Sequence, residues 1–374
     1  MAPKFAVLAC ASIVFAGCAS TDNAPEPASL PNITEYASAK VLWSQDVSKA
    51  GEFVFSPAVD GGVVYAAGRK GGVAAIDLSS GKLLRTFNTA KPISAGVAAL
   101  NGRVIAASEK GDLYAFDSEG KLLWSTPTGR EIVANPTITA DVVVVHSSNG
   151  DVEAYGMADG KRRWATQRAI PTLTLRSYAP VVASGPVLYA GLPAGRLQAL
   201  SRDEGTSLWE AQVSQPRGAT ELERVADISS APVADASSVC AVSFQGKVGC
   251  FEAKNGNPLW TREVSSSVGL AGDKGSIYVT DDEGSVLAYD KRSGRNLWKQ
   301  GRLFARQVST PAVFGRFIAI GDYQGYVHLL SAEDGSFQAR VKTDGSPILT
   351  APVAVGDTLV VQTSSGGVYA VTTR

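Results

Sequence analysis

The chain of 374 residues lacks an excess of charge of either sign, because 35 lysines and arginines balance 35 aspartates and glutamates. Without a basic field nothing holds the phosphates of a nucleic acid, so nucleic-acid binding is not expected. Histidine is scarce as well. Both histidines, His146 and His328, lie in strand-like segments of a repeat, where a structural role is favoured over a catalytic one.

Motifs that carry chemistry are also missing. The sequence contains no Cys-Cys dipeptide, nucleophile elbow, P-loop, zinc signature or Gly-rich dinucleotide fingerprint. The densest acidic cluster, Asp281-Asp282-Glu283, precedes Gly284 at a predicted turn, and no second cluster has the spacing of calcium ligands. The sequence therefore predicts a non-enzymatic protein with no catalytic residue, no metal site and no cofactor.

The N-terminus contains an apolar run from Phe5 to Phe15, which is too short to span a bilayer as a stable helix. Lys4 precedes the run, so residues 1–17 are predicted to be a secretory signal. The small residues before Cys18 resemble a bacterial lipobox, in which the cysteine becomes the lipidated first residue of the mature chain. Ala19 in place of aspartate points to the outer membrane. An ordinary cleaved signal with an incidental cysteine is the alternative.

The segment after Cys18 is rich in proline, serine and alanine and poor in large apolar side chains. Such a segment cannot bury enough surface to order itself. We therefore expect residues 18–38 to be a lipidated, flexible tether, followed by a folded domain over residues 39–374.

That domain repeats a unit of about forty residues, each with four short β-rich segments separated by turns. No segment sustains the 3.6-residue period of a helix. Such repeats are typical of propeller blades that stack in a ring. The sequence predicts an all-β, eight-bladed β-propeller of four-stranded antiparallel blades. The glycine that opens the third strand recurs at Gly71, Gly111, Gly150, Gly195, Gly246, Gly284, Gly325 and Gly366.

Tryptophans indicate how the ring closes. The last unit ends at Arg374 without a fourth strand, whereas Trp43 stands alone near the N-terminus in the same local pattern. We expect the strand around Trp43 to complete the last blade and remove an open sheet edge. The other five tryptophans each lie four residues after a turn glycine: Trp124, Trp164, Trp209, Trp260 and Trp298.

Two connections between units are longer than the others, 16 residues from Trp164 to Pro180 and 23 residues from Trp209 to Pro232. They flank the fourth unit, so they should emerge as neighbours on one face of the disc. The first contains the alternating stretch 172–175, Thr-Leu-Thr-Leu, a strand pattern in a loop.

Such a stretch predicts a surface that a partner covers, with Leu173, Leu175 and Arg176 at its centre. The alternative is that the leucines fold under the second connection. That connection places Glu221, Glu223, Arg224 and Asp227 around Leu222 and Val225, and these charges suit the polar rim of the patch.

The repeat motifs, Gly-x-Leu-Tyr-Ala-x-Asp and Gly-x-x-x-Trp, resemble the PQQ-type eight-bladed propellers. That group includes quinoprotein dehydrogenases and the BamB family of lipoproteins of the outer-membrane barrel-assembly (BAM) complex. The blocks LTLRSYAPV, TELERVADISSAPV and GDYQGYVHLLSAEDG extend the resemblance to the BamB family over nearly the whole chain. It implies a non-enzymatic scaffold, lipid-anchored in the outer membrane and facing the periplasm. A PQQ-dependent quinoprotein dehydrogenase is the alternative.

The resemblance also implies a partner, the periplasmic POTRA domains of BamA, and through BamA the rest of the BAM complex. Its contact motifs are L-x-L-R, matched by Leu173, Leu175 and Arg176, and D-x-D, of which Asp227 matches the start and Ser229 replaces the second acid. Asp227 would pair with a base on the partner or orient Arg176. Strand edges that receive unfolded outer-membrane proteins are a further implied role.

Cys240 and Cys250 lie on consecutive strands of one unit, at positions where other units have core residues. Directly opposed residues of a hairpin come within bridging range, and the implied periplasm is oxidising. Both a disulfide and a pair of buried thiols fit this pattern.

Overall fold

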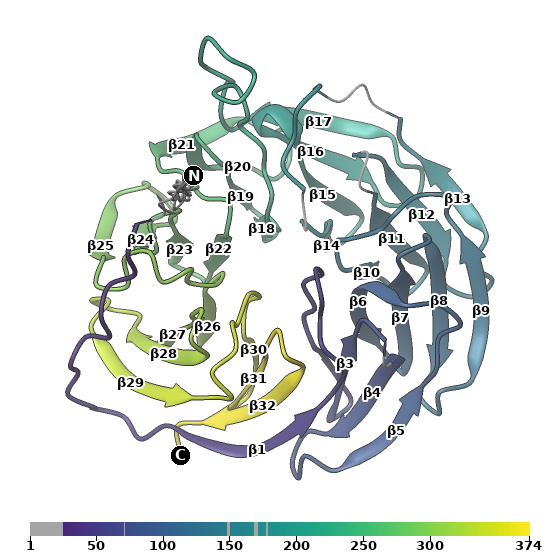
Figure 1. The fold of residues 1–374 in the computed structure, drawn as a ribbon. Helices are drawn as coiled ribbons and strands as arrows, with labels where there is room; N and C mark the ends of the chain where they lie inside the picture. Colours follow the sequence, from purple (N-terminus) through teal and green to yellow (C-terminus); the bar gives the residue numbers. More distant parts are fainter. Residues whose placement is uncertain (1–24, 71, 148–149, 168–170, 177–178) are drawn as a thin grey trace, which may run out of the picture.

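The computed structural model describes residues 25–70, 72–147, 150–167, 171–176 and 179–374. These residues form eight four-stranded antiparallel sheets arranged as the blades of a ring (Figure 1). The predicted eight-bladed β-propeller is confirmed.

Within a blade the strands follow one another from the centre of the ring to its rim (Figure 1). The first four blades contain β2 (Ala58–Asp60), β3 (Val63–Gly68), β4 (Gly72–Asp77) and β5 (Leu83–Phe87); β6 (Ile93–Leu100), β7 (Arg103–Ser108), β8 (Asp112–Asp117) and β9 (Leu122–Pro127); β10 (Thr137–Ile138), β11 (Val142–His146), β12 (Val152–Gly156) and β13 (Arg162–Ala165); and β14 (Val182–Ser184), β15 (Val187–Leu192), β16 (Arg196–Ser201) and β17 (Ser207–Gln212).

The other four blades continue the pattern, and the last one borrows its outer strand from the N-terminus. They contain β18 (Val233–Ala234), β19 (Ser238–Val242), β20 (Lys247–Glu252) and β21 (Pro258–Glu263); β22 (Gly269–Gly272), β23 (Ser276–Thr280), β24 (Val286–Asp290) and β25 (Asn296–Gln300); β26 (Ala312–Phe314), β27 (Phe317–Gly321), β28 (Tyr326–Ser331) and β29 (Phe337–Lys342); and β30 (Val353–Val355), β31 (Thr358–Gln362), β32 (Gly367–Thr372) and β1 (Lys40–Asp46).

The middle strands of a blade are buried over most of their length and largely apolar, as in β8, where Leu113 to Phe116 are all buried. A blade is covered on both faces by its neighbours, so these strands show a continuous apolar run instead of an alternation. The outer strand β9 alternates between exposed and half-buried residues, because it lies at the rim. The core of the domain therefore lies between the blades.

The ring closes as the sequence predicts. Strand β1 pairs antiparallel with β32, with Trp43 opposite Ala370. The indole of Trp43 then reaches the first blade, where its Nε1–H donates to the carbonyl of Leu78 at 2.8 Å. The two ends of the chain are thus joined in one sheet, and that sheet is locked to the next blade.

The same contact recurs at every tryptophan. Each indole donates to a backbone carbonyl of the following blade and packs on the turn glycine of that blade. A Cβ atom added to Gly81, for example, would lie 2.6 Å from the ring of Trp43. This close approach explains the glycine four residues before each tryptophan position. The other pairs are Trp124 with Gly160, Trp164 with Gly205, Trp209 with Gly256, Trp260 with Gly294 and Trp298 with Gly335.

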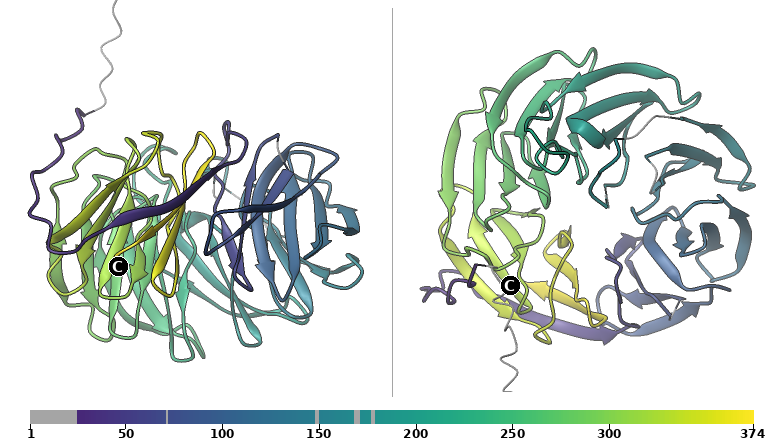
Figure 2. Two further views of the ribbon diagram at one scale, coloured as in Figure 1. Left: turned by 90° about the horizontal axis from the view of Figure 1, so that it is seen from below. Right: turned by 45° about the horizontal axis from the view of Figure 1, so that its top comes forward.

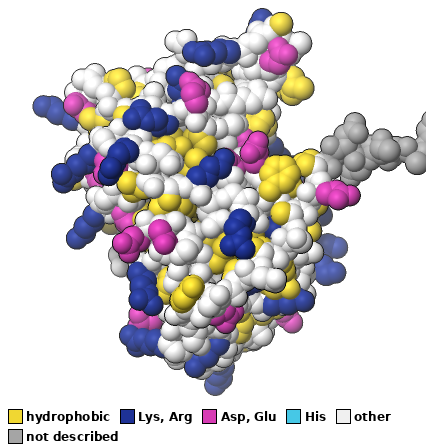
Figure 3. Space-filling model, turned by 90° about the vertical axis from the view of Figure 1, so that its left-hand side faces the viewer, with side chains coloured by type: hydrophobic (Ala, Val, Ile, Leu, Met, Phe, Trp, Pro, Cys, Tyr) yellow, Lys and Arg dark blue, Asp and Glu magenta, His cyan; other side chains and the backbone are white. Residues whose placement is uncertain are grey.

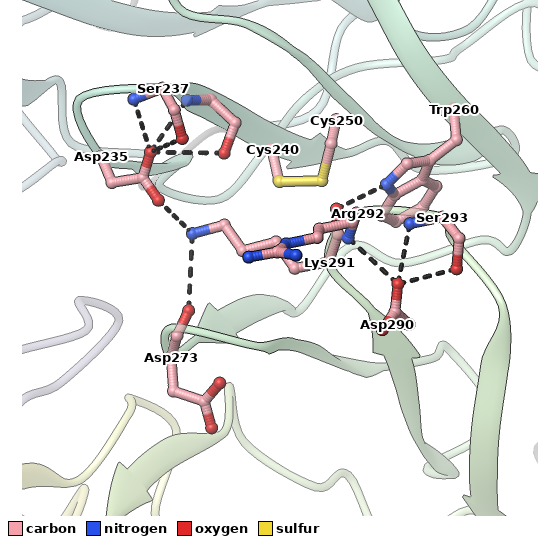
Figure 4. Close-up of a disulfide and its surroundings, with 11 residues drawn as sticks. Asp235, Ser237, Cys240, Cys250, Trp260, Asp273, Asp290, Lys291, Arg292 and Ser293 are labelled. Atoms are coloured by element: carbon pink, nitrogen blue, oxygen red, sulfur yellow. Dashed lines mark hydrogen bonds and ion pairs between the residues drawn. A yellow bond between two sulfur atoms is a disulfide. The ribbon is translucent and has the colours of Figure 1, made fainter.

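The fifth and sixth blades carry two further links. Cys240 and Cys250, directly opposed on β19 and β20, are joined by a disulfide in the core (Figure 4). Beside it, the buried Lys291 of blade six pairs with Asp235 of blade five at 2.5 Å. Burial acts to raise the pKa of Asp235, but the hydrogen bond from Lys291 and those from the following turn outweigh it and hold that pKa well below its ordinary value.

Residues 25–38, the described part of the predicted tether, contain no helix or strand and run along the rim of the disc (Figure 2). Cys18 and the predicted signal lie outside the described residues, so the lipidation site and the boundaries at residues 17 and 38 stay predictions. Among the helices of the described part, none is long and apolar enough to cross a bilayer.

Candidate functional site

The two long connections lie on one face of the disc, as predicted. They run from β13 to β14 and from β17 to β18, that is, into and out of the fourth blade. Residues 168–170 and 177–178 of the first connection lie outside the described residues. Thr172, Leu173, Thr174 and Leu175 form no strand despite their alternation.

The two leucines, which would share one face in a strand, lie in different surroundings here. Leu173 is 43% exposed, whereas Leu175 is half-buried. Leu175 and Arg176 line a hollow of about 640 Å³ at the centre of this face. We call this hollow the funnel and the side of the disc that carries it the funnel face. The alternative that both leucines fold under the second connection does not fit the exposed Leu173.

The funnel wall is built from seven outer-to-inner connections, and its charged members among the described residues are Arg176 and Asp282. Asp282 is engaged locally, because its carboxylate accepts hydrogen bonds from the hydroxyls of Ser265 and Ser267. The other residues of the described part that line the funnel are apolar or neutral. The funnel is therefore a hollow of mixed apolar and neutral polar lining, with the exposed cation of Arg176 at its edge.

Arg176 is held by two neighbouring parts of the ring. Its guanidinium donates to Glu131 of the connection before β10 at 2.9 Å and lies over the ring of Phe53, 5.4 Å from the centroid. Its side chain nevertheless remains 43% exposed. These contacts fix the direction of the arginine while leaving its surface available to a partner. Neither Glu131 nor Phe53 was predicted, since both come from distant repeat units.

Asp227 has a role that the sequence did not indicate. Its side chain is only 3% exposed, and its two oxygens accept backbone N–H groups of Leu175 at 2.7 Å and Ala194 at 2.9 Å. Ala194 lies in the 3₁₀ turn Pro193–Gly195 between β15 and β16. Asp227 therefore ties the second connection to the first and to the fourth blade, and it positions Leu175.

The rest of the second connection divides into a buried part and an exposed turn. Val225 is 4% exposed, so it belongs to the interior and not to the surface patch that the sequence suggested. In the turn, the carboxylate of Glu223 accepts the amides of Ala219 and Thr220, which lowers the pKa of Glu223. Arg224 pairs with Glu221 at 3.2 Å. Three charges of the predicted rim are thus satisfied within their own turn, and the fourth, Asp227, is buried.

Ser229, where the family motif has a second aspartate, is half-buried in the funnel wall. Its hydroxyl donates to the carbonyl of Ser267 at 3.0 Å, a contact with the next connection. Ser267 also binds the carboxylate of Asp282. A serine at this position therefore links two blades without placing a second carboxylate near Asp282.

The funnel does not fit a quinone and calcium site. The described residues include no group of three or more His, Cys, Asp or Glu that could hold a metal ion. Cys240 and Cys250 are used in the core disulfide. Burial lowers the pKa of both histidines. His146 is hydrogen-bonded to the carbonyl of Ala179, and His328 is hydrogen-bonded to Asp322 and Arg340.

Comparisons with known proteins agree with this description. The family model for "Outer membrane protein assembly factor BamB" matches residues 69–300 and 284–374. The chain is 39% identical to the BamB of Burkholderia pseudomallei, over 97% of each chain, and 34% identical to that of Bordetella pertussis, over 98% of this chain and 96% of the relative.

Solved structures show the same fold. The crystal structure of BamB from Moraxella catarrhalis aligns with a TM-score of 0.82 at 23% identity, covering 90% of this chain and all of that one. A quinohemoprotein alcohol dehydrogenase from Comamonas testosteroni aligns with a TM-score of 0.73 at 14% identity, covering 90% of this chain and 76% of that one.

Proposed function

The chain belongs to the BamB family of outer-membrane protein assembly factors, and on this premise we propose that it is a lipid-anchored scaffold that binds the periplasmic POTRA domains of BamA. It is not an enzyme: its close relatives are assembly factors, and the dehydrogenases that share its fold are distant in sequence. Its work would be to hold BamA in a pose suited to inserting outer-membrane proteins.

One observation carries the proposal: the exposed Leu173 and the funnel-edge pair Leu175 and Arg176 form a surface that is fixed from below by Asp227. Apolar anchors beside an arginine are typical energetic centres of interfaces. Because the supporting bonds of Asp227 are internal, the surface is preformed. A partner gains the apolar contacts without ordering the loop first.

The test replaces Leu173 and Leu175 with alanine and measures binding to the POTRA domains of BamA. We expect binding to weaken by at least about tenfold, while the melting temperature hardly changes. Leu122 and Leu123 on β9 are the control pair, because they are as exposed as Leu173, at 49% and 38%, but lie on the rim. Normal binding by the Leu173 and Leu175 variant, or equal loss in the control pair, would contradict the proposed surface.

The anchor is tested separately. Cys18→Ala removes the thiol that the lipobox would acylate, so we expect the variant to appear in the soluble periplasmic fraction or to remain uncleaved. Unchanged fractionation with the outer membrane would refute the lipid anchor while leaving the BamA-binding surface untouched.

A further inference from the structure

Residues 28–37, which we call the strap, lie against the rim of the seventh blade (Figure 2). The amide of Ala28 donates to the carbonyl of Phe304 at 3.0 Å, and the amide of Tyr36 donates to the carbonyl of Gln338 at 2.9 Å. The strap is therefore bonded to the propeller at both of its ends.

Three arginines also bind the strap, one of them at its first residue. Each donates to a backbone carbonyl, so the contacts depend on the course of the chain and not on its side chains. The pairs are Arg306 Nη1 with Ala28 at 2.9 Å, Arg340 Nη2 with Pro31 at 3.0 Å and Arg302 Nη2 with Asn32 at 3.1 Å.

Two of these arginines belong to a buried network. Arg306 is 2% exposed and pairs with Asp322 at 2.8 Å, and Asp322 also binds Nε2 of His328 at 3.0 Å. Arg340 donates from Nε to Nδ1 of His328 at 3.2 Å. Arg306 also donates from Nη1 to the carbonyl of Ala28. Loss of the strap would remove an acceptor from a buried guanidinium, which is costly.

Apolar packing adds to these bonds. Ile33 packs against the core cluster that contains Trp298 and Phe337, and Ala37 packs against the cluster of the last two blades. The residues on either side of Ile33, Asn32 and Thr34, are exposed. The strap thus presents one side to the propeller along its length.

The strap begins on the funnel face. Phe304 and Arg306, which bind Ala28, lie in the connection from β25 to β26, and residues 307–310 of that same connection line the funnel. From there the chain crosses the rim to β1 (Figure 2). The N-terminal part of the chain therefore reaches the propeller beside the funnel.

We propose that the strap orients the disc on the membrane. By docking, it places the attachment point of the anchored N-terminal segment on the funnel face of the disc. This rests on the proposed lipid anchor at Cys18. Cys18 and Ala28 are 10 positions apart, which allows a reach of about 35 Å. Cys18 and Lys40 are 22 positions apart and would reach about 75 Å if the strap were free. Docking of the strap therefore halves the length of free chain between the anchor and the disc, and it moves the attachment point to the funnel face.

Surface charge offers no competing source of orientation on the side of the disc shown in Figure 3. There, basic and acidic side chains are interspersed with apolar ones, without a field of a single sign. The short free segment would then hold the disc with its funnel face toward the lipid surface. A partner at Leu173 and Arg176 is presented on the membrane side of the disc.

The first measurement is hydrogen exchange of the full mature chain. The amides of Ala28, Tyr36 and Ala37, which donate to Phe304 and Gln338, should exchange slowly. Replacing residues 29–34 by a Gly-Ser segment of equal length keeps the carbonyls but removes the packing of Ile33 and raises the entropy that docking must overcome. The exchange of these amides should therefore speed by at least about tenfold. The same replacement at residues 19–24 is the matched control and should leave it unchanged. Fast exchange in the unmodified chain would overturn the docking.

The second measurement reports orientation, on the lipidated chain in nanodiscs that contain nitroxide-labelled lipid headgroups. Glu283→Cys places a fluorophore on the funnel face and Lys274→Cys places one on the opposite face, at the two ends of β23. With the core disulfide closed, Cys18 acylated and Cys10 removed with the predicted signal, each introduced thiol is free for labelling. Five residues of β23 span about 17 Å, so we expect the label at residue 283 to be quenched at least about twofold more strongly.

The strap replacement at residues 29–34 should abolish this difference, and the replacement at residues 19–24 should preserve it. Equal quenching of both labels in the unmodified chain, or a difference that survives the loss of the strap, would overturn the orienting role. A chain that does not attach to the nanodiscs at all would instead refute the lipid anchor, and the orientation with it.

Discussion

The contacts between blades repeat around the ring, whereas the contacts of the connections around the fourth blade are specific to that place. Between blades, one arrangement recurs: a tryptophan indole donates to the next blade and packs on a turn glycine, as Trp43 does with Leu78 and Gly81. Around the fourth blade the contacts occur once. Asp227 binds the amides of Leu175 and Ala194 and so ties the two long connections and the fourth blade together.

With the proposed binding surface on the connections, this difference would separate stability from binding. Each repeated contact joins only neighbouring blades, so the ring is held by a sum of local interfaces. A connection can then lengthen and acquire a new surface without disturbing the blades. The two can be separated by experiment, because changes to the ring should act on stability and changes to the connections on partner binding.

The largest effect is expected where the ring closes. Deleting residues 39–47 removes β1 and the buried Trp43, so we expect the free energy of unfolding to fall by about 3 kcal/mol or more. The deletion also exposes β32 as a free edge. Denaturant titration measures the loss. An unchanged midpoint would show that the ring does not depend on its N-terminal strand.

A smaller effect should isolate one contact between blades. Gly81→Ala places a methyl group 2.6 Å from the indole of Trp43, whereas Gly61→Ala meets nothing within 4 Å, and both glycines have positive φ angles, of 72° and 56°. Backbone strain costs about 1–2 kcal/mol at either site, and the clash should add about 1–3 kcal/mol at Gly81 only. Equal thermal stabilities of the two variants would mean that the indole moves aside at no cost, so the glycine would not be required.

The sequence predicted the parts of the molecule that depend on repeated local patterns. Strand runs, turn glycines and the isolated Trp43 each have counterparts in other repeat units, so the eight blades and their closure could be inferred. The position of the long connections followed from their lengths alone. Leu173, Leu175 and Arg176 were singled out because an apolar alternation does not belong in a loop.

Contacts between distant segments left no such pattern. Asp227 and Leu175 are 52 residues apart, and the bond joins a side chain to a backbone amide that any residue would supply. The strap likewise binds mostly through its backbone, so its composition predicted a free tether although the chain is bonded to Arg306 and Arg340. These interactions depend on how the folded units lie in space, which periodicity does not reveal.

The smallest effect on stability, and the sharpest division between the two regions, is expected at Asp227. Asp227→Ala leaves the amides of Leu175 and Ala194 without their acceptor, which should cost about 1–3 kcal/mol of stability. Because the segment that carries Leu175 and Arg176 is then released, binding to BamA should weaken as well. Asp227→Asn keeps one carbonyl oxygen as an acceptor, so its stability and its BamA binding should lie between those of the unchanged protein and of Asp227→Ala.

The three variants together distinguish support from contact, when melting temperature and BamA binding are measured on each. If Asp227 acts by positioning, Asp227→Ala lowers both quantities, whereas the alanine pair at Leu173 and Leu175 lowers binding alone. Loss of stability with normal binding in Asp227→Ala would make this acid a core residue without influence on the surface. Loss of binding in Asp227→Ala beside normal binding in the leucine pair would mean that the acid itself meets the partner, which its 3% exposure argues against.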